Sequence, residues 1–224
     1  MTMIVWKKRR AHSFSVLISG VVLLGAVATG CTSQHDGQSS TPTSTSSARK
    51  STTANERYHL IAPQSVLDGY TLHRSEPLIA ADLPSAYRDL DGDLTGGLYA
   101  QYLSPSPSYD HVLTLVGLWG TVGDLDAVAG RAIPSVMRGT LEKPGSALLG
   151  TATTMHPDGL DDAVMKCQLL DRIINGAIDH STVCSWADHA TIGVLHLAGD
   201  PAFDLETCAA LTARLRAQTR IAGS

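Results

Sequence analysis

The sequence predicts an α+β domain, an antiparallel sheet of about five strands with helices packed on one face, preceded by a signal peptide and a disordered tether. Three observations predict this arrangement. Apolar runs of strand length recur between residues 97 and 198. Two segments with helical spacing follow residues that cap helices. The first 56 residues have a composition that suits export and tethering better than a packed core.

The N-terminal segment has the parts of a secretory signal, which we assign to residues 1–30. Four consecutive basic residues, Lys7–Arg10, form a positive block that stays on the cytoplasmic side of a membrane. The run Phe14–Ala28 is apolar apart from two serines and two glycines. This run is short for a spanning helix, which needs about 20 residues. The small residues Ala28-Thr29-Gly30 then precede Cys31, as cleavage by a signal peptidase requires.

Cys31 is the candidate lipidation site. The residues before it resemble a bacterial lipobox, although a lipobox prefers Leu where Ala28 stands. The cysteine of a lipobox receives a diacylglyceryl thioether, carries acyl chains such as palmitate, and becomes the first residue of the mature protein. We therefore expect lipid on Cys31 to hold the protein at the outer face of the cytoplasmic membrane. The alternative is a single N-terminal transmembrane anchor that is not cleaved, and both arrangements place the remainder outside the cytoplasm.

Residues 31–56 are predicted to be a disordered tether. Ser, Thr, Gly, Gln and Ala dominate, and no large apolar residue occurs between Gln34 and Asn55. Such a segment cannot bury enough surface to offset its chain entropy. As a flexible linker it spans on the order of 25–30 Å, which holds a domain clear of the lipid headgroups.

The charge of the exported part argues against nucleic acid as a partner. Without the signal block, 13 Lys+Arg remain against 21 Asp+Glu, which is a net charge of about −8. Nucleic acid and an anionic membrane surface both repel such a domain. We therefore expect membrane association through the lipid on Cys31 and no nucleic-acid partner.

The remaining residues, 57–224, have the length of one extracytoplasmic domain. Its entry, to about Leu72, is expected to be irregular because of Pro63 and the turn signal Asp68-Gly69. Strands are then predicted wherever apolar residues gather in runs of strand length. These strands cover Gly97–Leu103, His111–Trp119, Val164–Ile174, Ala177–Ala187 and Thr191–Ala198.

Three helices are predicted between and after these strands. A short one covers Leu83–Leu90, and a longer one runs from the cap Asp124 to about Met137, bent or shortened by Pro134. The last helix follows Asp200-Pro201. Its spacing turns Leu205, Cys208, Leu211 and Leu215 inward and places Arg214, Arg216 and Arg220 where they complement the C-terminal dipole.

A disulfide is predicted from hairpin register. Asn175-Gly176 is the preferred two-residue hairpin turn, so paired residues have numbers that sum to 351, as those of Cys167 and Cys184 do. The alternation of ladder bonds makes them a non-hydrogen-bonded pair with Cα atoms about 4.5 Å apart, which a disulfide accepts. The same register sets Met165 opposite Trp186, and Cys208 is left as a buried free thiol.

No metal site or cofactor is predicted. His180, Cys184 and His189 have spacings that zinc could use, but Cys184 prefers a disulfide outside the cell and His189 falls in a turn. Asp89, Asp91 and Asp93 alternate as in a calcium loop. Leu94 and Ala100 nevertheless stand where that loop needs Gly and a bidentate Glu, so a polar surface turn is the better interpretation.

No catalytic residue is predicted either. Motifs of nucleophilic hydrolases, zinc proteases and phosphate-binding loops are absent from the sequence. Asp161-Asp162 and Asp188-His189 are neighbours in sequence, and neighbours on a strand point to opposite faces. His196 is interpreted as a hydrogen-bonded structural histidine, and Trp119 and Trp186 as core aromatics.

The segment Cys184–Val194 resembles one that recurs in secreted proteins and lipoproteins of actinobacterial type. There, Cys-x-Trp-Ala-Asp-x-x-Thr-x-Gly-Val follows an earlier cysteine and precedes a C-terminal helix. The resemblance covers about the last 60 residues, together with the signal and the tether. It implies location and a shared fold, and it implies no activity.

The first functional hypothesis is a surface lipoprotein whose single domain is a non-catalytic binding or interaction module of the cell envelope. Its partner would be an envelope protein or a cell-wall ligand. The second hypothesis is an envelope hydrolase whose site is assembled from sequence-distant residues. A third, a metal-binding lipoprotein, depends on His180 and His189.

Overall fold

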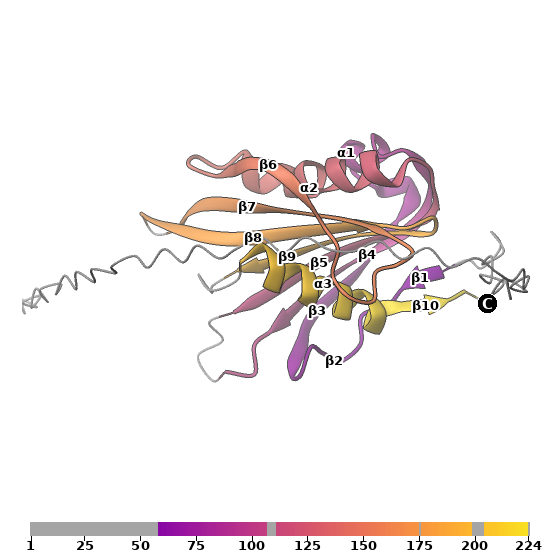
Figure 1. Cartoon of the computed structure of the whole chain (residues 1–224), viewed down its shortest axis with the longest axis horizontal. Coiled ribbons are helices and arrows are strands. Elements are labelled where there is room, and N and C mark those ends of the chain that lie inside the picture. Colours follow the sequence, from indigo (N-terminus) through magenta and orange to yellow (C-terminus); the bar gives the residue numbers. More distant parts are fainter. Residues whose placement is uncertain (1–57, 107–110, 175, 199–203, 224) are drawn as a thin grey trace, which may run out of the picture. The chain divides into compact units, whose positions relative to one another are not determined.

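An eight-stranded antiparallel sheet organises the folded part of the chain (Figure 1). The computed structural model describes residues 58–106, 111–174, 176–198 and 204–223, which belong to one compact unit. The strands, in their order across the sheet, are β2 (Ser65–Val66), β3 (Tyr70–Ile79), β4 (Gly92–Leu103), β5 (Val112–Val122), β9 (Thr191–Ala198), β8 (Ala177–Ala187), β7 (Val164–Ile174) and β6 (Ala147–Met155). A separate two-stranded ladder joins β1 (Tyr58–Leu60) to β10 (Arg220–Ala222).

The two long helices lie on opposite faces of this sheet. They are α2 (Leu125–Leu141) and α3 (Leu205–Thr219), accompanied by η1 (Ala80–Asp82) and the short α1 (Ser85–Arg88). On β8, Val183 packs in one core cluster with α2, and its neighbour Cys184 packs in the other cluster with α3. Because consecutive strand residues point to opposite faces, the helices cover different faces, as Figure 1 shows. We call these the α2 face and the α3 face.

The predicted fold class is therefore wrong on two points, the number of strands and the placement of helices on one face. The sequence analysis missed β3, where Arg74, Ser75 and Glu76 interrupt any apolar run because this strand lies near the sheet edge. It also missed β6, which is rich in Thr, contains Gly150, and has no apolar run because most of its residues are exposed. Edge strands bury few side chains, so their sequences carry a weak signal.

The entry to about Leu72, expected to be irregular, contains β1, β2 and the start of β3, and β10 was not predicted either. The elements that were predicted keep their bounds to within about five residues. The bounds of β7, β8 and β9 are those expected, and α1 begins directly after Pro84. Asp124 caps α2 by accepting from the Ala127 N–H at 3.1 Å, and Pro134 lies within a helix that continues to Leu141. The cap of α3 is Asp204 and not Asp200, which lies outside the described residues; Asp204 accepts from the Thr207 N–H at 2.7 Å.

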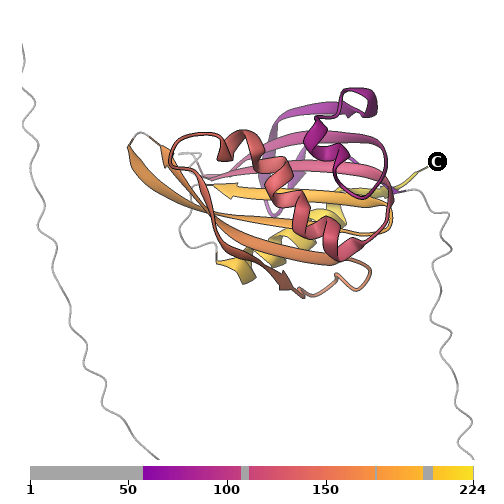
Figure 2. The same cartoon turned by 90° about the horizontal axis from the view of Figure 1, so that it is seen from above.

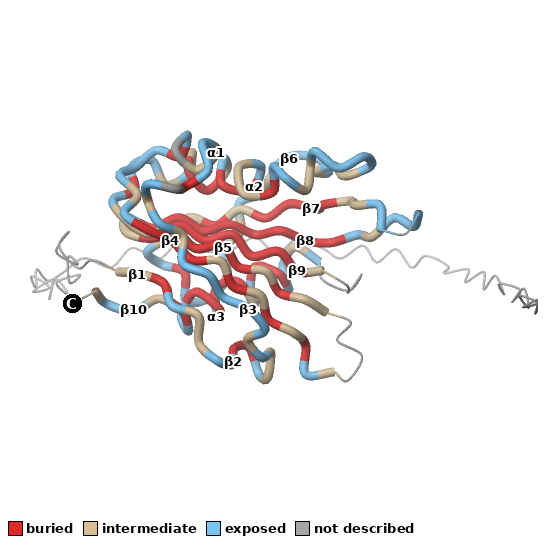
Figure 3. Tube along the Cα trace, turned by 180° about the vertical axis from the view of Figure 1, so that it is seen from behind, coloured by how far each residue is buried: buried red, intermediate tan, exposed pale blue. Residues whose placement is uncertain are grey.

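Both faces of the central strands are buried (Figure 3). On the α3 face, β1 packs over β5, where Gly117 leaves room for Leu60; a Cβ at Gly117 would lie 2.5 Å from Leu60 Cδ1. On the same face, a Cβ at Gly193 would lie 2.0 Å from the buried Trp186 ring. The glycine of the Cys-x-Trp segment therefore makes space for its tryptophan on the neighbouring strand.

Candidate functional site

The candidate lipidation site Cys31 and the apolar run Phe14–Ala28 lie outside the described residues. Membrane attachment therefore stays a prediction. Within the part of the chain that is described, no helix is both long and apolar enough to cross a membrane.

The structure joins Cys167 to Cys184, as the hairpin register predicts. The two residues are directly opposite on β7 and β8, with Cα atoms 4.1 Å apart and sulfurs 2.01 Å apart. Met165 lies opposite Trp186, also as expected. The remaining described cysteine, Cys208 on α3, is a buried free thiol whose pKa is raised by burial, so it carries little thiolate.

The weak metal candidates are not brought together. The sulfur of Cys184 is bonded to Cys167, and the Nδ1 atom of His180 lies 2.6 Å from Asp171 Oδ1 on an exposed part of the hairpin. His189 lies in the turn after β8, whereas His180 is near the other end of that strand. Among the described residues, no group of three or more His, Cys, Asp or Glu side chains could hold a metal ion.

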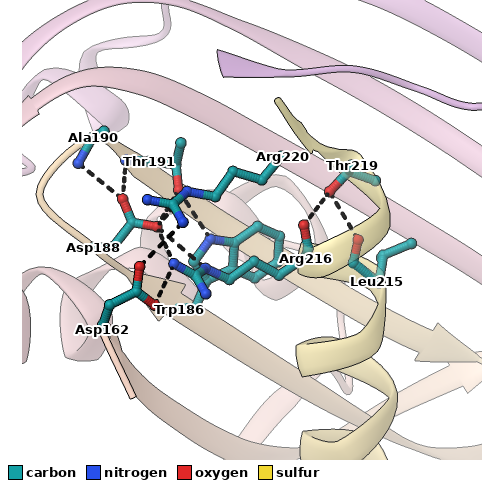
Figure 4. Close-up of polar contacts among 9 residues, drawn as sticks. All are labelled: Asp162, Trp186, Asp188, Ala190, Thr191, Leu215, Arg216, Thr219 and Arg220. Carbon is teal, nitrogen blue, oxygen red and sulfur yellow. Dashed lines mark hydrogen bonds and ion pairs between the residues drawn. The ribbon is translucent and has the colours of Figure 1, made fainter. Parts of the chain in front are cut away.

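The turn between β8 and β9 contains the most elaborate polar cluster of the structure, centred on Asp188 (Figure 4). Asp188 is 1 % exposed. Its Oδ1 accepts from the N–H groups of Ala190 (2.9 Å) and Thr191 (2.7 Å), which closes the turn. Its Oδ2 accepts from the Thr191 hydroxyl (2.6 Å) and from Arg216 Nη2 (2.7 Å). The Trp186 indole donates to the same Thr191 hydroxyl at 3.3 Å, so the aromatic and the turn are linked.

Two arginines extend this cluster to four further parts of the chain. Arg216 of α3, itself 5 % exposed, also pairs with Asp162 at 2.8 Å. Arg220 of β10 donates to Asp162 at 3.1 Å and stacks 3.6 Å above the ring centre of Tyr58 in β1. Its Nε lies 3.5 Å from Asp188 Oδ2, an ion pair without the alignment of a hydrogen bond. The cluster therefore joins the β8–β9 turn, the β6–β7 connection, α3, β10 and β1.

The charges in this cluster are held in their ionised forms by one another. Burial opposes ionisation of Asp162, but the hydrogen bond and charge of Arg216, with the charge of Arg220, lower the pKa of its carboxyl. Burial likewise opposes the charge of Arg216, and its bonds to Asp162 and Asp188 raise its pKa. Each carboxylate oxygen of Asp188 accepts at least two hydrogen bonds. We therefore interpret the cluster as a structural clamp and not as an acid–base site.

Ser181 and His196 form the pair that looks most like part of a hydrolase site. His196 Nε2 lies 3.1 Å from Ser181 Oγ, and both residues are buried. The Ser181 hydroxyl has one proton, which it donates to the Leu170 carbonyl at 3.2 Å. His196 must then donate through Nε2, the reverse of the arrangement in which histidine activates a serine. Burial, with the charge of Arg172, lowers the pKa of His196 to about 4, so the imidazole is neutral and structural, as predicted.

On the α2 face, α2 packs mainly on β7, β8 and β9 (Figure 2), and the segment of η1 and α1 packs against α2 and one end of β4 and β5. A row of side chains on β3, β4 and β5 stays partly exposed on the same face. In one cross-strand row, Arg74 lies opposite Gln101, Gln101 opposite Thr114, and Thr114 opposite His196. Side chains directly opposite each other have Cβ atoms about 4.5–5.5 Å apart, so the row is continuous. Gln101 and Thr114 are partly exposed, and within the described ranges their side chains form no hydrogen bond.

An aromatic ring lies beside this polar row. Tyr99 is directly opposite Glu76 and is partly exposed on the same face. The guanidinium of Arg74 lies over it, 5.9 Å from the ring centre, and also pairs with Glu76. The strip therefore offers unpaired amide and hydroxyl groups, an aromatic ring, and charges that neutralise each other. We call Arg74, Glu76, Tyr99, Gln101 and Thr114 the open strip.

Two hollows occur elsewhere on the surface. One, of about 560 Å³, lies between α3 and the connection that follows β6; it includes Met155, His156, Glu206 and Arg214. The other, of about 750 Å³, lies at the start of α2 and includes Asp89, Asp91, Asp93, Asp124 and Arg131. In the second hollow Asp91 Oδ2 accepts from the Asp124 N–H at 3.1 Å, so this carboxylate ties the segment before β4 to the start of α2.

The residues of the Cys-x-Trp segment are apparent in the sequence, but their partners are not. Arg216 and Arg220 were expected to complement a helix dipole at the surface, and Asp162 had no predicted role. A buried arginine on a helix gives no local signal, since its partners are 28 and 54 positions away in sequence. The one available signal was Asp188 three positions before Thr191, a spacing typical of a side chain that caps a turn.

No protein-family model matches this chain, and a search of curated proteins gives no match. The resemblance to secreted actinobacterial lipoproteins therefore stays a prediction that depends on the residues of the segment Cys184–Val194.

Proposed function

We propose that this chain is an exported lipoprotein of the cell envelope, attached to the outer face of the cytoplasmic membrane through lipid on Cys31. The basic block, the apolar run and the small residues before Cys31 support export and attachment. The buried disulfide between Cys167 and Cys184 supports the same location, because cytoplasmic thiols are kept reduced.

We further propose that the folded domain is a non-catalytic binding module, and the open strip is the observation that carries this. Polar side chains on a rigid sheet that lack hydrogen-bond partners among the described residues are available to a ligand. Since Arg74 and Glu76 neutralise each other, the strip suits a neutral ligand with many hydroxyl or amide groups. A glycan of the cell wall has this chemistry, and its sugar rings can pack on Tyr99.

Lipidation is tested on the full-length chain expressed in a bacterial host. The mature N-terminal peptide should begin at Cys31 and carry the mass of a diacylglyceryl group, and Cys31→Ala should leave the chain unprocessed. Cys208→Ala is the matched control and should be processed normally. A mature protein that retains residues 1–30 would favour the single-span anchor and overturn lipidation.

Ligand binding is tested by titrating the full-length protein in detergent with a β-1,4-linked tetramer of N-acetylglucosamine. Replacing Gln101 and Thr114 together by Ala removes two hydrogen-bonding side chains, so affinity should fall about tenfold or more. Ser75→Ala, an exposed change on the other face of β3, should leave affinity unchanged. Equal affinity of the double variant and the Ser75 control, or no binding at all, would overturn the glycan assignment.

A further inference from the structure

The two edges of the eight-stranded sheet differ in how far they are open to pairing. One edge is β2, which is two residues long. The other is β6, nine residues long and paired with β7 alone. Natural proteins protect such an edge with charged residues, proline or β-bulges. Ala147–Met155 contains no charged residue and no proline, and its one irregularity is confined to the residues between Leu149 and Thr153. The backbone N–H and C=O groups on the outer side of β6 are therefore available to another strand.

An exposed apolar surface continues from this edge along the α3 face. Leu149 of β6 lies opposite Leu169 of β7, and these side chains are 40 % and 41 % exposed. Four positions further along β7, and so on the same face, Ile173 lies opposite Ile178; these are 52 % and 63 % exposed. Four large apolar side chains beside an open edge are unusual for a surface that only water covers.

The internal irregularity of β6 selects a register for pairing with itself. Its pairing with β7 is regular over Ala147–Leu149 and over Thr153–Met155, and it shifts between these segments. Consider two copies of β6 paired antiparallel and centred on Thr151. The segment Ala147–Leu149 of one copy then lies opposite Thr153–Met155 of the other copy. Leu149 then faces Thr153 of the second copy. Both residues lie on the α3 face, so the pairing keeps each face of the combined sheet continuous.

We propose that two copies of this chain associate through antiparallel pairing of their β6 edges about a two-fold axis at Thr151. Copies with a net charge of about −8 repel each other, so self-association favours a surface that carries no charge, and β6 is such a surface. Association covers the outer side of β6 and shields Leu149 and Leu169 from water. This proposal goes beyond ligand binding at the open strip and does not depend on lipidation.

The register is tested with cysteine variants of the full-length chain. Copies carrying Leu149→Cys or Thr153→Cys, with different tags, are expressed together and oxidised. Opposite residues of an antiparallel pair have Cα atoms about 4.5–5.5 Å apart, within disulfide range. The mixed pair should form a covalent dimer, and neither variant should do so when expressed alone. Both positions are exposed, so the intramolecular fold and the Cys167–Cys184 bond should persist.

Leu149→Cys expressed together with Ser65→Cys on the other edge is the matched control. Crosslinking of Leu149→Cys to itself, or equal crosslinking of the mixed pair and the control, would overturn the proposed register. A second measurement uses Thr153→Lys, which adds two like charges near the axis and should convert a dimer to a monomer in sedimentation analysis. A wild-type protein that sediments as a monomer at all tested concentrations would overturn the proposal. This holds also if a different protein covers β6.

Discussion

The end of the sheet at the β8–β9 turn buries charge, whereas the end at the β7–β8 turn exposes hydrocarbon. At the first end Asp188 and Arg216 are 1 % and 5 % exposed, and each is bonded to several partners. At the second end Ile173 and Ile178 are more than half exposed. The two ends belong to the same strand, β8, so the strand conformation by itself does not explain the difference.

The difference comes from the layers that cover each end. The β8–β9 turn lies beneath the C-terminal part of α3, with β1 and β10 nearby, so a polar group there must find its partners within the protein. The β7–β8 hairpin extends past β9, since residues 177–181 of β8 pair with β7 alone. Among the described residues, no third strand pairs with this part of β8. Whether a residue is buried therefore depends on the elements that pack over it. Its polarity determines only whether it needs hydrogen-bond or ionic partners once it is buried.

The largest expected effect comes from breaking the buried end. Asp188→Ala removes a buried carboxylate that bonds Arg216 and two backbone N–H groups, so the buried guanidinium keeps only its pairing with the half-exposed Asp162 and the two N–H groups lose their acceptor. Such a loss costs about 3–5 kcal/mol of the free energy of unfolding. Urea denaturation followed by circular dichroism measures it.

Asp162→Ala is the matched control for this change. It removes a carboxylate that also bonds Arg216 but is 54 % exposed, so the expected loss is about 1 kcal/mol or less. If Asp188→Ala and Asp162→Ala lower the free energy of unfolding equally, Asp188 is not the centre of the clamp.

The second prediction concerns the disulfide that lies between the two ends. Replacing Cys167 and Cys184 together by Ala removes a crosslink between residues 17 positions apart, which should lower the free energy of unfolding by about 3 kcal/mol. Thermal unfolding of the purified full-length protein measures this loss. Cys208→Ala, also buried but not crosslinked, separates the loss of the crosslink from the loss of buried sulfur. Equal losses in the two proteins would show that the crosslink itself contributes nothing.

The third prediction is a pH dependence at His196. The unfolded chain binds this proton near the ordinary histidine pKa of about 6.5, whereas in the fold the pKa is about 4. Between these values the unfolded state holds more protons, so the free energy of unfolding falls as pH falls from 6.5 towards 4. The full loss is about 3 kcal/mol at the lower limit, and above pH 6.5 His196 contributes no pH dependence.

Urea unfolding at several pH values tests this, with His196→Gln expected to remove the slope and exposed His180→Gln expected to keep it. An unchanged slope in His196→Gln would mean that another group is responsible. Protonation of Asp162, whose pKa is lowered in the fold, adds to the loss only at more acidic pH.

Sequence reasoning succeeded where the physics is local. The bounds of β7 and β8 and the pairing of Cys167 with Cys184 all follow from one two-residue turn, because a short turn fixes the register of everything beyond it. It failed for β6 and β3, because these strands are identified by their pairing with neighbouring strands and have too few apolar residues to be identified from sequence. The faces covered by α2 and α3 depend on long-range connections that no local pattern records.

The same division applies to the functional residues. Asp188 and Thr191 could be identified as a turn because they are close in sequence. The contacts of Arg216 and Arg220 with Asp188 could be identified only from the folded structure. The open strip combines residues of three strands, one of which was not predicted. Sites assembled across a sheet become visible only when the register of every strand in it is known.

The smallest expected effect on stability is at the exposed end, and it tests whether that end is uncovered within a single chain. Ile178→Thr keeps a β-branched side chain on β8 but removes apolar surface that water already contacts, so the free energy of unfolding should change by less than about 0.5 kcal/mol. The matched change, Ile192→Thr on β9, places a hydroxyl in a site that is 1 % exposed and should cost about 2 kcal/mol or more. Chemical denaturation of both variants gives the comparison directly. Similar losses for the two would mean that Ile178 is covered by the protein's own residues, and the contrast between the two ends of β8 would then disappear.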